Sequence, residues 1–279
     1  MNVYIASLPR SGTTLLGIIL NQHPQCTCIG ESYYWRNYQP GTSICSCGHT
    51  NCHILNEVHA KISSEKTVLS FCDTCIKLDA NLLNGASYSI DNSSLVTAEA
   101  GLTKLMDVYR AVTANPIIID TSTNVTLGKY LALSNDYKVI LLTRDPRGVL
   151  YSFKKALRRY GRSRPLIIYA SSFLAFAQAA FELIQRRNVL WATYEDMCSN
   201  PEYEMRRICR FLRITHNPLM IDLSKVTHHL VMGNRIRNLH TLQITEDIEW
   251  KASLDEQELD ILRLNKKIVE LYSKLNYTF

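Results

Sequence analysis

A short stretch near the N-terminus has the residue types and spacing of an anion-binding loop. A polar turn, residues 7–12, lies between an apolar segment, residues 3–6, and a helix that is predicted to begin at Thr13 and Thr14. The free N–H groups of such a turn converge on one point, and the helix dipole adds positive potential there. The sequence therefore predicts a phosphate-binding loop of the kind that holds nucleotides.

This loop departs from the G-x-x-x-x-G-K-[ST] pattern of proteins that hydrolyse ATP or GTP. Ser7 replaces the first glycine and Thr13 replaces the lysine, whereas Gly12 and Thr14 keep their places. The usual lysine reaches the β- and γ-phosphates, so its loss argues against nucleotide hydrolysis. Arg10, inside the loop, is the nearest fixed cation. The alternative without a ligand is a capped helix behind a buried strand, with a solvated arginine.

A second set of residues suits a phosphate monoester. Arg144 ends the strand predicted over residues 138–142, Pro146 can occupy the first turn of the next helix, and Ser152 follows eight residues after the arginine. If the helix folds back beside its strand, an arginine fork and a hydroxyl group can bind one phosphate. An arginine that caps a neighbouring helix, with an ordinary helical serine, is the alternative.

Together, the two elements resemble those of the PAPS-dependent sulfotransferase family, in which 3′-phosphoadenosine-5′-phosphosulfate (PAPS) is the donor. Residues 9–14, PRSGTT, resemble the 5′-phosphosulfate loop, and the R-x-P-x-x-x-x-x-S pattern of residues 144–152 resembles the 3′-phosphate element. The chain is most similar to bacterial-type members. The resemblance implies transfer of a sulfuryl group to an acceptor hydroxyl or amine, with PAP as the product and no required metal.

The resemblance also implies roles for residues outside these elements. In the tyrosylprotein branch of the family, a glutamate at the spacing of Glu31 is the general base; an ordinary solvated glutamate is the alternative. Other branches use a histidine, so His23 and His228 are reserve candidates, and Arg235 is a less secure donor contact. Arg10 is the second expected catalytic residue, because it would stabilise the charge on the bridging oxygen of the leaving 5′-phosphate. The full predicted donor-binding set is Arg10, Ser11, Gly12, Thr13, Thr14, Arg144, Ser152, Tyr194, Gly233 and Arg237.

Polar residues also follow the apolar run of residues 116–120. Asp120 and Ser122 lie where the carboxyl end of a parallel strand meets the ligand crevice. Capping of a helix over residues 125–133 is the alternative use of these side chains. Thr123 stands where related sulfotransferases often carry a lysine, so no lysine role is assigned.

Cysteines form a third chemical feature: seven of the nine lie between residues 26 and 75. Three of them, Cys45, Cys47 and Cys52, are weak candidates for a zinc site, because dense thiolates and imidazoles can hold this ion. Their C-x-C-G-x-x-x-x-C spacing departs from the usual paired ligands, and Cys72 and Cys75 are possible additions. Structural thiols, a zinc site and a disulfide remain open, in that order of preference.

Apolar runs separated by helical segments predict a three-layer αβα fold with a mainly parallel sheet, of the P-loop NTPase kind. A length of 279 residues fits a single sulfotransferase domain, 1–279. We expect residues 32–97 to form a Cys-rich insertion on the acceptor side. The predicted strands cover residues 3–6, 116–120, 138–142 and 188–193.

Charge and hydropathy limit the kinds of binding partner and the cell location that we expect for this chain. A net charge of +6 suits an anionic donor but is too small and scattered to indicate nucleic acid. The longest apolar run, residues 166–181, is too short for an ordinary membrane span and predicts a buried helix. The functional loop lies close to Met1, so we expect no leader, no stable membrane insertion and a cytoplasmic location. A small molecule, carbohydrate or lipid is the expected acceptor.

Three other function classes are compatible with parts of this pattern. A P-loop nucleotide kinase or NTPase would hydrolyse ATP with Mg²⁺ and would not bind PAP. A non-catalytic PAP-binding module would bind PAP without transferring sulfate. A zinc-stabilised interaction protein centred on residues 45–75 would hold metal as its main function.

Overall fold

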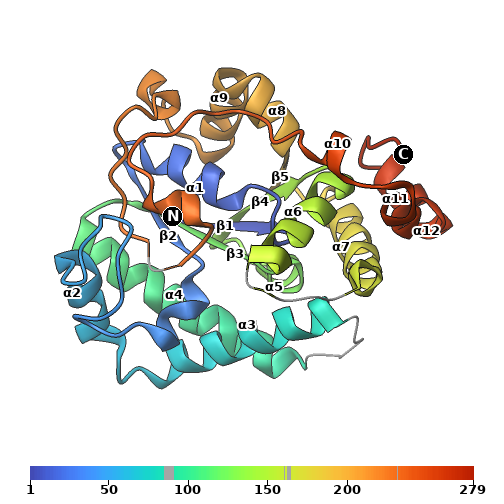
Figure 1. Ribbon diagram of the computed structural model, residues 1–279. Coiled ribbons are helices and arrows are strands. Elements are labelled where there is room, and N and C mark those ends of the chain that lie inside the picture. Colours follow the sequence, from blue (N-terminus) through green and yellow to red (C-terminus); the bar gives the residue numbers. More distant parts are fainter. Residues whose placement is uncertain (85–90, 160, 162–164, 231) are drawn as a thin grey trace.

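The computed structural model describes residues 1–84, 91–159, 161, 165–230 and 232–279, and it is built around a parallel sheet (Figure 1). Every strand pairing in this sheet is parallel, which confirms the predicted α/β fold. The strand order is β2-β3-β1-β4-β5. The strands are β1 (Asn2–Ser7), β2 (Cys26–Gly30), β3 (Ile117–Thr123), β4 (Tyr137–Thr143) and β5 (Val189–Thr193).

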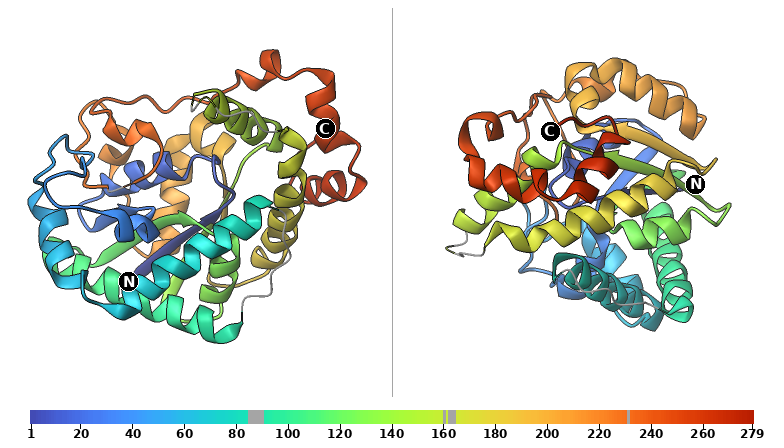
Figure 2. Two further views of the ribbon diagram at one scale, coloured as in Figure 1. Left: turned by 60° about the horizontal axis from the view of Figure 1, so that its bottom comes forward. Right: turned by 90° about the vertical axis from the view of Figure 1, so that its right-hand side faces the viewer.

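Both faces of the sheet are covered, and alternate residues of β1 supply two separate cores. Val3 and Ile5 pack with α1 (Thr13–Asn21) and with the pair α8 (Tyr194–Ser199) and α9 (Pro201–Leu212). Tyr4 and Ala6 belong to the core on the opposite face. Figure 2 shows α9 and the teal helices on opposite sides of the sheet. Burial on both faces explains why these strands read as continuous apolar runs.

Residues 262–277 also contribute to the other core, which is otherwise built from helices that lie between β2 and β5 in the sequence. They include α4 (Asn92–Thr113), α5 (Val125–Leu131) and α7 (Ala170–Leu183). The stretch Leu166–Leu183, which combines η2 (Leu166–Tyr169) with α7, is long and apolar enough to cross a membrane by length and composition alone. Within the protein, 44% of that stretch is buried.

Between β2 and α4, the chain forms η1 (Ser32–Asn37), α2 (His53–Ile62) and α3 (Lys66–Asn84). The sequence shows no clear helical period over α3, because this helix packs on η1, α7 and η2 as well as on α4. Its most extensive packing is on α4. That packing is close at Gly101, where a Cβ atom would collide with the Thr67 carbonyl oxygen and lie 2.7 Å from Phe71 Cβ. A glycine inside α4 is therefore required by its contact with α3.

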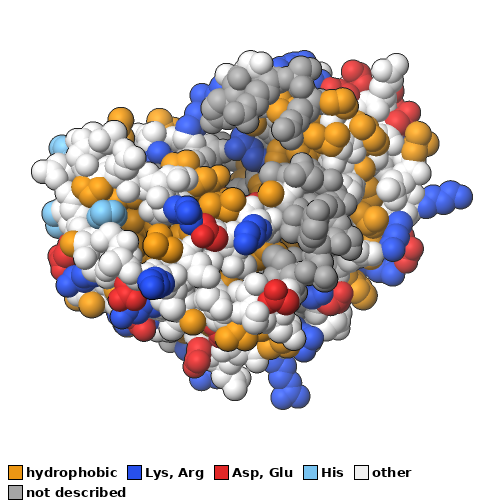
Figure 3. All heavy atoms as spheres, turned by 90° about the horizontal axis from the view of Figure 1, so that it is seen from below, with side chains coloured by type: hydrophobic (Ala, Val, Ile, Leu, Met, Phe, Trp, Pro, Cys, Tyr) orange, Lys and Arg blue, Asp and Glu red, His pale blue; other side chains and the backbone are white. Residues whose placement is uncertain are grey.

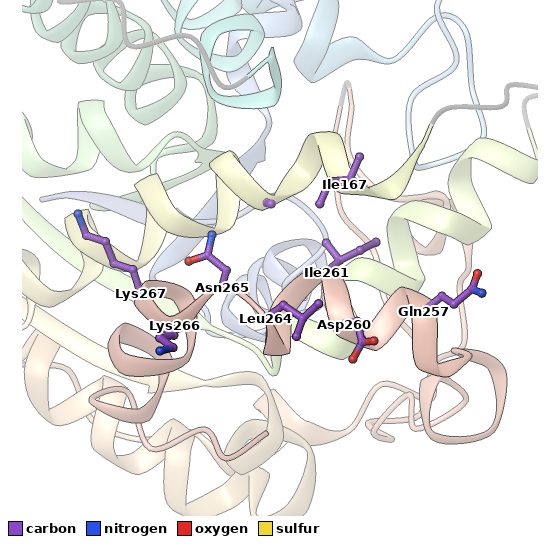
Figure 4. A pocket seen from close by; sticks show the side chains of 9 residues that line it. Ile167, Gln257, Asp260, Ile261, Leu264, Asn265, Lys266 and Lys267 are labelled. Carbon is purple, nitrogen blue, oxygen red and sulfur yellow. The ribbon is translucent and has the colours of Figure 1, made fainter.

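The C-terminal part crosses above the carboxyl edge of the sheet and ends beside α7 (Figure 1). It contains η3 (Pro218–Ile221), η4 (Arg235–Asn238), α10 (Trp250–Ser253), α11 (Glu256–Arg263) and α12 (Lys266–Ser273). Asn265 caps α12 by accepting a hydrogen bond from the Ile268 N–H at 3.2 Å, so the terminal helix is split in two. A hollow of about 730 Å³ lies between α11, α12 and η2 (Figure 4).

Charged side chains are interspersed rather than gathered in one stripe on the face seen from below (Figure 3). A basic run follows Ser152, with lysine or arginine at positions 154, 155, 158, 159, 162 and 164. Lys154 pairs with Glu258, and Lys155 pairs with Asp247. These two lysines therefore join α6 (Pro146–Arg159) to the C-terminal segment. Two further members of the run, Arg162 and Arg164, lie outside the described residues.

Replacing Gly101 tests the packing of α3 against α4. Gly101→Ala should lower the free energy of unfolding by about 1–3 kcal/mol, because overpacking against a backbone carbonyl outweighs the better helix propensity of alanine. Chemical denaturation measures this. The control Ala100→Ser, at an exposed site of the same helix, should change stability by less than about 0.5 kcal/mol. A stabilised Gly101→Ala protein would contradict this account.

Candidate active site

The loop between β1 and α1 has a strained and tightly enclosed backbone. Arg10 and Gly12 both have left-handed φ values, 78° and 94°. A Cβ atom on Gly12 would lie 2.5 Å from Tyr194 Cδ2, so only glycine fits there. Ser7 Oγ donates a hydrogen bond to the Leu142 carbonyl oxygen at 2.8 Å. The serine that replaces the usual first glycine therefore ties the base of the loop to β4.

The first turn of α1 presents donor groups that are free to bind a ligand. The first N–H groups of any α-helix lack partners within the helix, and no acidic residue occupies the first turn of α1. Ser11 Oγ is buried and has no hydrogen-bond partner among the described residues. A buried hydroxyl without a partner is costly unless a ligand or water satisfies it. The loop therefore fits a bound oxyanion.

Arg144 holds this loop in place from β4. Its side chain is buried, donates a hydrogen bond to the Arg10 carbonyl oxygen at 3.1 Å, and lies 4.2 Å above the Tyr194 ring. A second bond from Arg144, also 3.1 Å, reaches the Asp247 carbonyl oxygen. Ser152 Oγ accepts a bond from Arg10 Nε at 3.1 Å. Arg144 and Ser152, which the sequence predicted to act together, thus both contact the phosphate loop. The side chain of Ser152, however, bonds Arg10 and not Arg144.

Residues 232–237 contact the phosphate loop from the C-terminal segment. The Asn234 N–H donates to Thr14 Oγ1 at 3.1 Å, and a Cβ atom on Gly233 would lie 3.2 Å from the same oxygen. Arg237 Nη1 donates to the Leu230 carbonyl oxygen at 3.3 Å. Gly233 and Arg237 therefore lie near the start of α1, whereas the less secure candidate Arg235 is exposed.

Glu31 lies immediately after β2, where η1 begins. Burial raises the pKa of Glu31 to about 7, and the nearby carboxylates of Asp79 and Asp120 add to this rise. The positive charges of Arg10 and Arg237 act on the same carboxyl group in the opposite direction. The carboxyl group of Glu31 is therefore close enough to two cations to be affected by their charge, although Arg10 and Arg237 lie far apart in the sequence.

A buried hydrogen-bond network fixes the backbone that carries Glu31. Ser32 Oγ contacts the Asp120 carboxylate, and the Ser32 N–H donates to Ser122 Oγ at 3.1 Å. The Ser122 N–H donates to Asp120 Oδ1 at 2.7 Å. Asp120 and Ser122, which the sequence placed at the ligand crevice, thus act on the β2–η1 junction. Capping of α5 is done by Asn124, whose Oδ1 accepts the Leu127 N–H at 3.0 Å.

Asp79 is a site residue that sequence reasoning missed. It comes from α3, accepts a bond from Asn124 Nδ2 at 3.0 Å, and also contacts the Tyr33 hydroxyl group. Burial raises the pKa of Asp79 itself. No local pattern marked this aspartate, because its importance comes from a helix that brings it toward Glu31.

Both reserve histidines are engaged elsewhere. His23 Nε2 bonds the Thr215 carbonyl oxygen at 2.9 Å, and its Nδ1 accepts the Gln25 N–H at 3.2 Å. His23 therefore has no ring nitrogen available as a base. His228 Nε2 bonds the Arg237 carbonyl oxygen at 2.6 Å, and its Nδ1 is buried without a partner among the described residues. His228 thus positions the segment that carries Arg237.

Comparison with known proteins identifies the family. The sequence model described as "Sulfotransferase family" matches residues 2–218. This chain belongs to the sulfotransferase family. Its membership makes it a PAPS-dependent sulfotransferase, as the sequence predicted. No curated protein sequence matches the chain.

Solved structures agree with this sulfotransferase at the level of the fold. The sulfotransferase domain from the curacin biosynthetic pathway is 18% identical in sequence. The match covers 99% of this chain and 98% of that domain, with a TM-score of 0.53. A sulfotransferase from Alicyclobacillus acidocaldarius is 12% identical, with 100% and 96% coverage and a TM-score of 0.52. The sulfotransferase domain of the Synechococcus PCC 7002 olefin synthase is 18% identical, with 100% and 95% coverage and a TM-score of 0.50.

The raised pKa of Glu31 makes the stability of this sulfotransferase depend on pH. Between the ordinary value of 4.5 and the folded value of about 7, the folded chain binds more protons at Glu31 than the unfolded chain does. This contribution to the free energy of unfolding therefore falls as pH rises through that range. Glu31→Gln removes it, so the variant should gain Tm relative to the wild type as pH rises from about 4.5 to 7.5.

Thermal unfolding at a series of pH values measures this difference. Glu57→Gln, at an exposed site on α2, is the matched control and should show a Tm difference that does not vary with pH. A difference for Glu31→Gln that is equally flat would mean that the carboxyl group is not destabilised by the fold.

Proposed function

We propose that this sulfotransferase moves the sulfuryl group of PAPS to a hydroxyl or amine of its acceptor, with Glu31 as the general base and no metal in the transfer step. The observation that carries the proposal is that an anion site and a carboxyl group of raised pKa lie close together. Arg10 and the start of α1 form an anion site, and a carboxyl group with a pKa of about 7 lies within the field of the same arginine.

The donor would be held at both of its phosphate ends. We assign its 5′ end to Arg10, the Ser11 hydroxyl and the N–H groups of residues 12–14. Its 3′-phosphate is assigned to Arg144 and Ser152, with Arg237 nearby. The buried, unpartnered Ser11 hydroxyl supports the first assignment, and the buried Arg144 stacked on Tyr194 supports the second. Gly233 allows close approach to Thr14, which would keep the loop narrow.

The donor supplies the sulfuryl group and a 5′-phosphate that leaves. The bond from sulfur to the phosphate oxygen breaks as the bond to the acceptor atom forms. Arg10 and fixed N–H donors would stabilise the charge on the departing oxygen, which is why the step needs no metal. Glu31 would take the acceptor's proton, and a pKa near neutrality suits a base at physiological pH.

The acceptor would enter beside η1, in the region of residues 32–97. Tyr34, partly exposed next to Glu31, and the Tyr33 ring 4.4 Å from it provide aromatic surface. Such surface suits a small molecule, carbohydrate or lipid with a hydroxyl group. A cytoplasmic location is part of the proposal, supported by nine cysteines that are all free thiols in the structure.

The direct test is transfer of labelled sulfate. The protein is incubated with PAPS labelled in the sulfuryl group and with an extract of the source cells, and labelled products are identified by mass spectrometry. Labelled product that requires the protein is expected. ATP hydrolysis with Mg²⁺ and no PAP binding would instead indicate a nucleotide kinase or NTPase. PAP binding without any transfer would indicate a non-catalytic module.

Replacing Arg144 tests the 3′-phosphate site. Arg144→Ala should weaken PAP binding about tenfold or more, since loss of a charge-assisted contact costs about 1.5–3 kcal/mol. Isothermal calorimetry measures the Kd. Arg158→Ala, at an exposed position on α6, should bind PAP like the wild type. An unchanged Kd for Arg144→Ala, in protein that is folded by circular dichroism, would remove Arg144 from the donor site.

Replacing Glu31 tests the base. Glu31→Gln should bind PAP normally but lose turnover by about 10²–10⁴-fold, the usual contribution of a general base. In the wild type, kcat should rise with pH through about 7 as the carboxyl group loses its proton, and this rise should be absent in the variant. If turnover and its pH dependence survive the substitution, another group accepts the proton.

A further inference from the structure

Four potential metal ligands from two distant segments converge outside the donor loop. One ligand atom from each of Cys45, Cys47, Cys52 and His229 lies within 4.8 Å of all the others. His229 Nδ1 is 3.2 Å from Cys52 Sγ and 3.8 Å from Cys45 Sγ. The histidine follows Cys52 by 177 residues, so only the fold brings the set together.

We propose that these four side chains form a structural Zn²⁺ site. Bond lengths of about 2.3 Å to sulfur and 2.0–2.1 Å to nitrogen place tetrahedral ligand atoms roughly 3.3–3.8 Å apart. The two distances to His229 Nδ1 are close to this range. Three soft thiolates and one imidazole make up a Cys₃His set, which favours zinc over magnesium or calcium. A disulfide would use only two of the sulfurs and would give the imidazole no role.

The backbone around the cysteines is arranged as a ligand turn. The Gly48 N–H donates to the Cys45 carbonyl oxygen at 2.9 Å, and Gly48 has a left-handed φ of 87°. The Cys47 N–H donates to Cys45 Sγ, and the Leu55 N–H donates to Cys52 Sγ. Cys52 is also the N-cap residue of α2, where the helix dipole favours a negative sulfur. These contacts fix the positions of the Cys45 and Cys52 sulfur atoms.

Ser46 joins the cysteine turn to both neighbours of His229. Its Oγ donates to the His228 carbonyl oxygen and accepts the Leu230 N–H, each at 2.8 Å, while its N–H donates to the Leu230 carbonyl oxygen at 3.2 Å. These three bonds hold the backbone on either side of the histidine. The backbone of the fourth ligand is therefore held beside the cysteine turn before any metal binds.

The site lies directly beside the segment that carries Gly233 and Arg237. The Leu230 carbonyl oxygen accepts a bond from Arg237, and His228 bonds the Arg237 backbone. A metal bound at His229 would thus fasten the Cys-rich turn to the part of the chain that carries Gly233 and Arg237. We infer that zinc stabilises the donor-binding form of this segment, an inference that rests on the proposed function.

Metal content tests the site itself. The full chain, purified with zinc under reducing conditions, should contain about one zinc ion per chain by elemental mass spectrometry. Replacement by Co²⁺ should give the thiolate charge-transfer and visible bands of a tetrahedral site. Cys47→Ser and His229→Ala should lose the metal and these bands, whereas Cys198→Ser, at a similarly half-buried cysteine, should keep both.

Three results would overturn the site: wild-type protein without bound metal, variants that keep the metal of the wild type, or a disulfide between these cysteines in protein kept under reducing conditions. His229 lies outside the cysteine turn, so His229→Ala tests the site even if the cysteine variants fail to fold. Folded His229→Ala protein that binds no metal would support the site.

PAP affinity tests the link to the donor segment. Removing zinc with a chelator should raise the Kd for PAP several-fold, and added zinc should restore it. If zinc binds but its removal leaves the Kd for PAP unchanged, zinc does not affect the donor-binding segment. The site then stabilises only the local structure. If the zinc-loaded wild type does not bind PAP at all, the proposed function fails while the metal site stands.

Discussion

The conformation of one short turn, residues 8–12, is the constraint on which the site depends. Left-handed φ values at Arg10 and Gly12 turn the chain from β1 into α1 and direct the first N–H groups of the helix toward the carboxyl edge of the sheet. Such a turn is costly for a non-glycine residue such as Arg10. The Arg144 side chain, held between the Arg10 carbonyl oxygen and the Tyr194 ring, stabilises it. The Arg144 guanidinium group, placed at the end of β4, thus connects the loop to Tyr194, which follows β5.

The electrostatics around Glu31 affect both the pKa of its carboxyl group and the stability of the folded chain. Positive groups gather around the start of α1, and a carboxyl group is held near them in a partly buried position where its pKa rises to about 7. Burial of a carboxylate disfavours its charged form, whereas Arg10 and Arg237 favour it. The result is a group that changes protonation near neutral pH. The raised pKa lowers the stability of the fold as pH rises, and the same raised pKa suits the general base proposed above.

Two irregular parts of the chain, far apart in sequence, complete the site from opposite sides. The segment after β2 carries Glu31 and the cysteine turn, and the segment after η3 carries His229, Gly233 and Arg237. They meet through the hydrogen bonds of Ser46 and through the contact between Gly30 and the Met232 carbonyl oxygen, where a Cβ atom would come within 2.8 Å. Hydrogen bonds therefore join the two segments directly, and the four side chains of the proposed metal site lie at the same junction.

The sequence alone determined the parts that depend on local signals. Apolar runs predicted four of the five strands, and the spacing of residues 9–14 and of Arg144 predicted an anion site, because turn chemistry and burial are written in neighbouring residues. Only the tertiary structure showed β2 as a strand, paired Ser152 with Arg10 rather than with Arg144, and brought His229 to the cysteines. These features depend on contacts between residues far apart in the chain, and no local period or motif records which distant side chain will fill a given position.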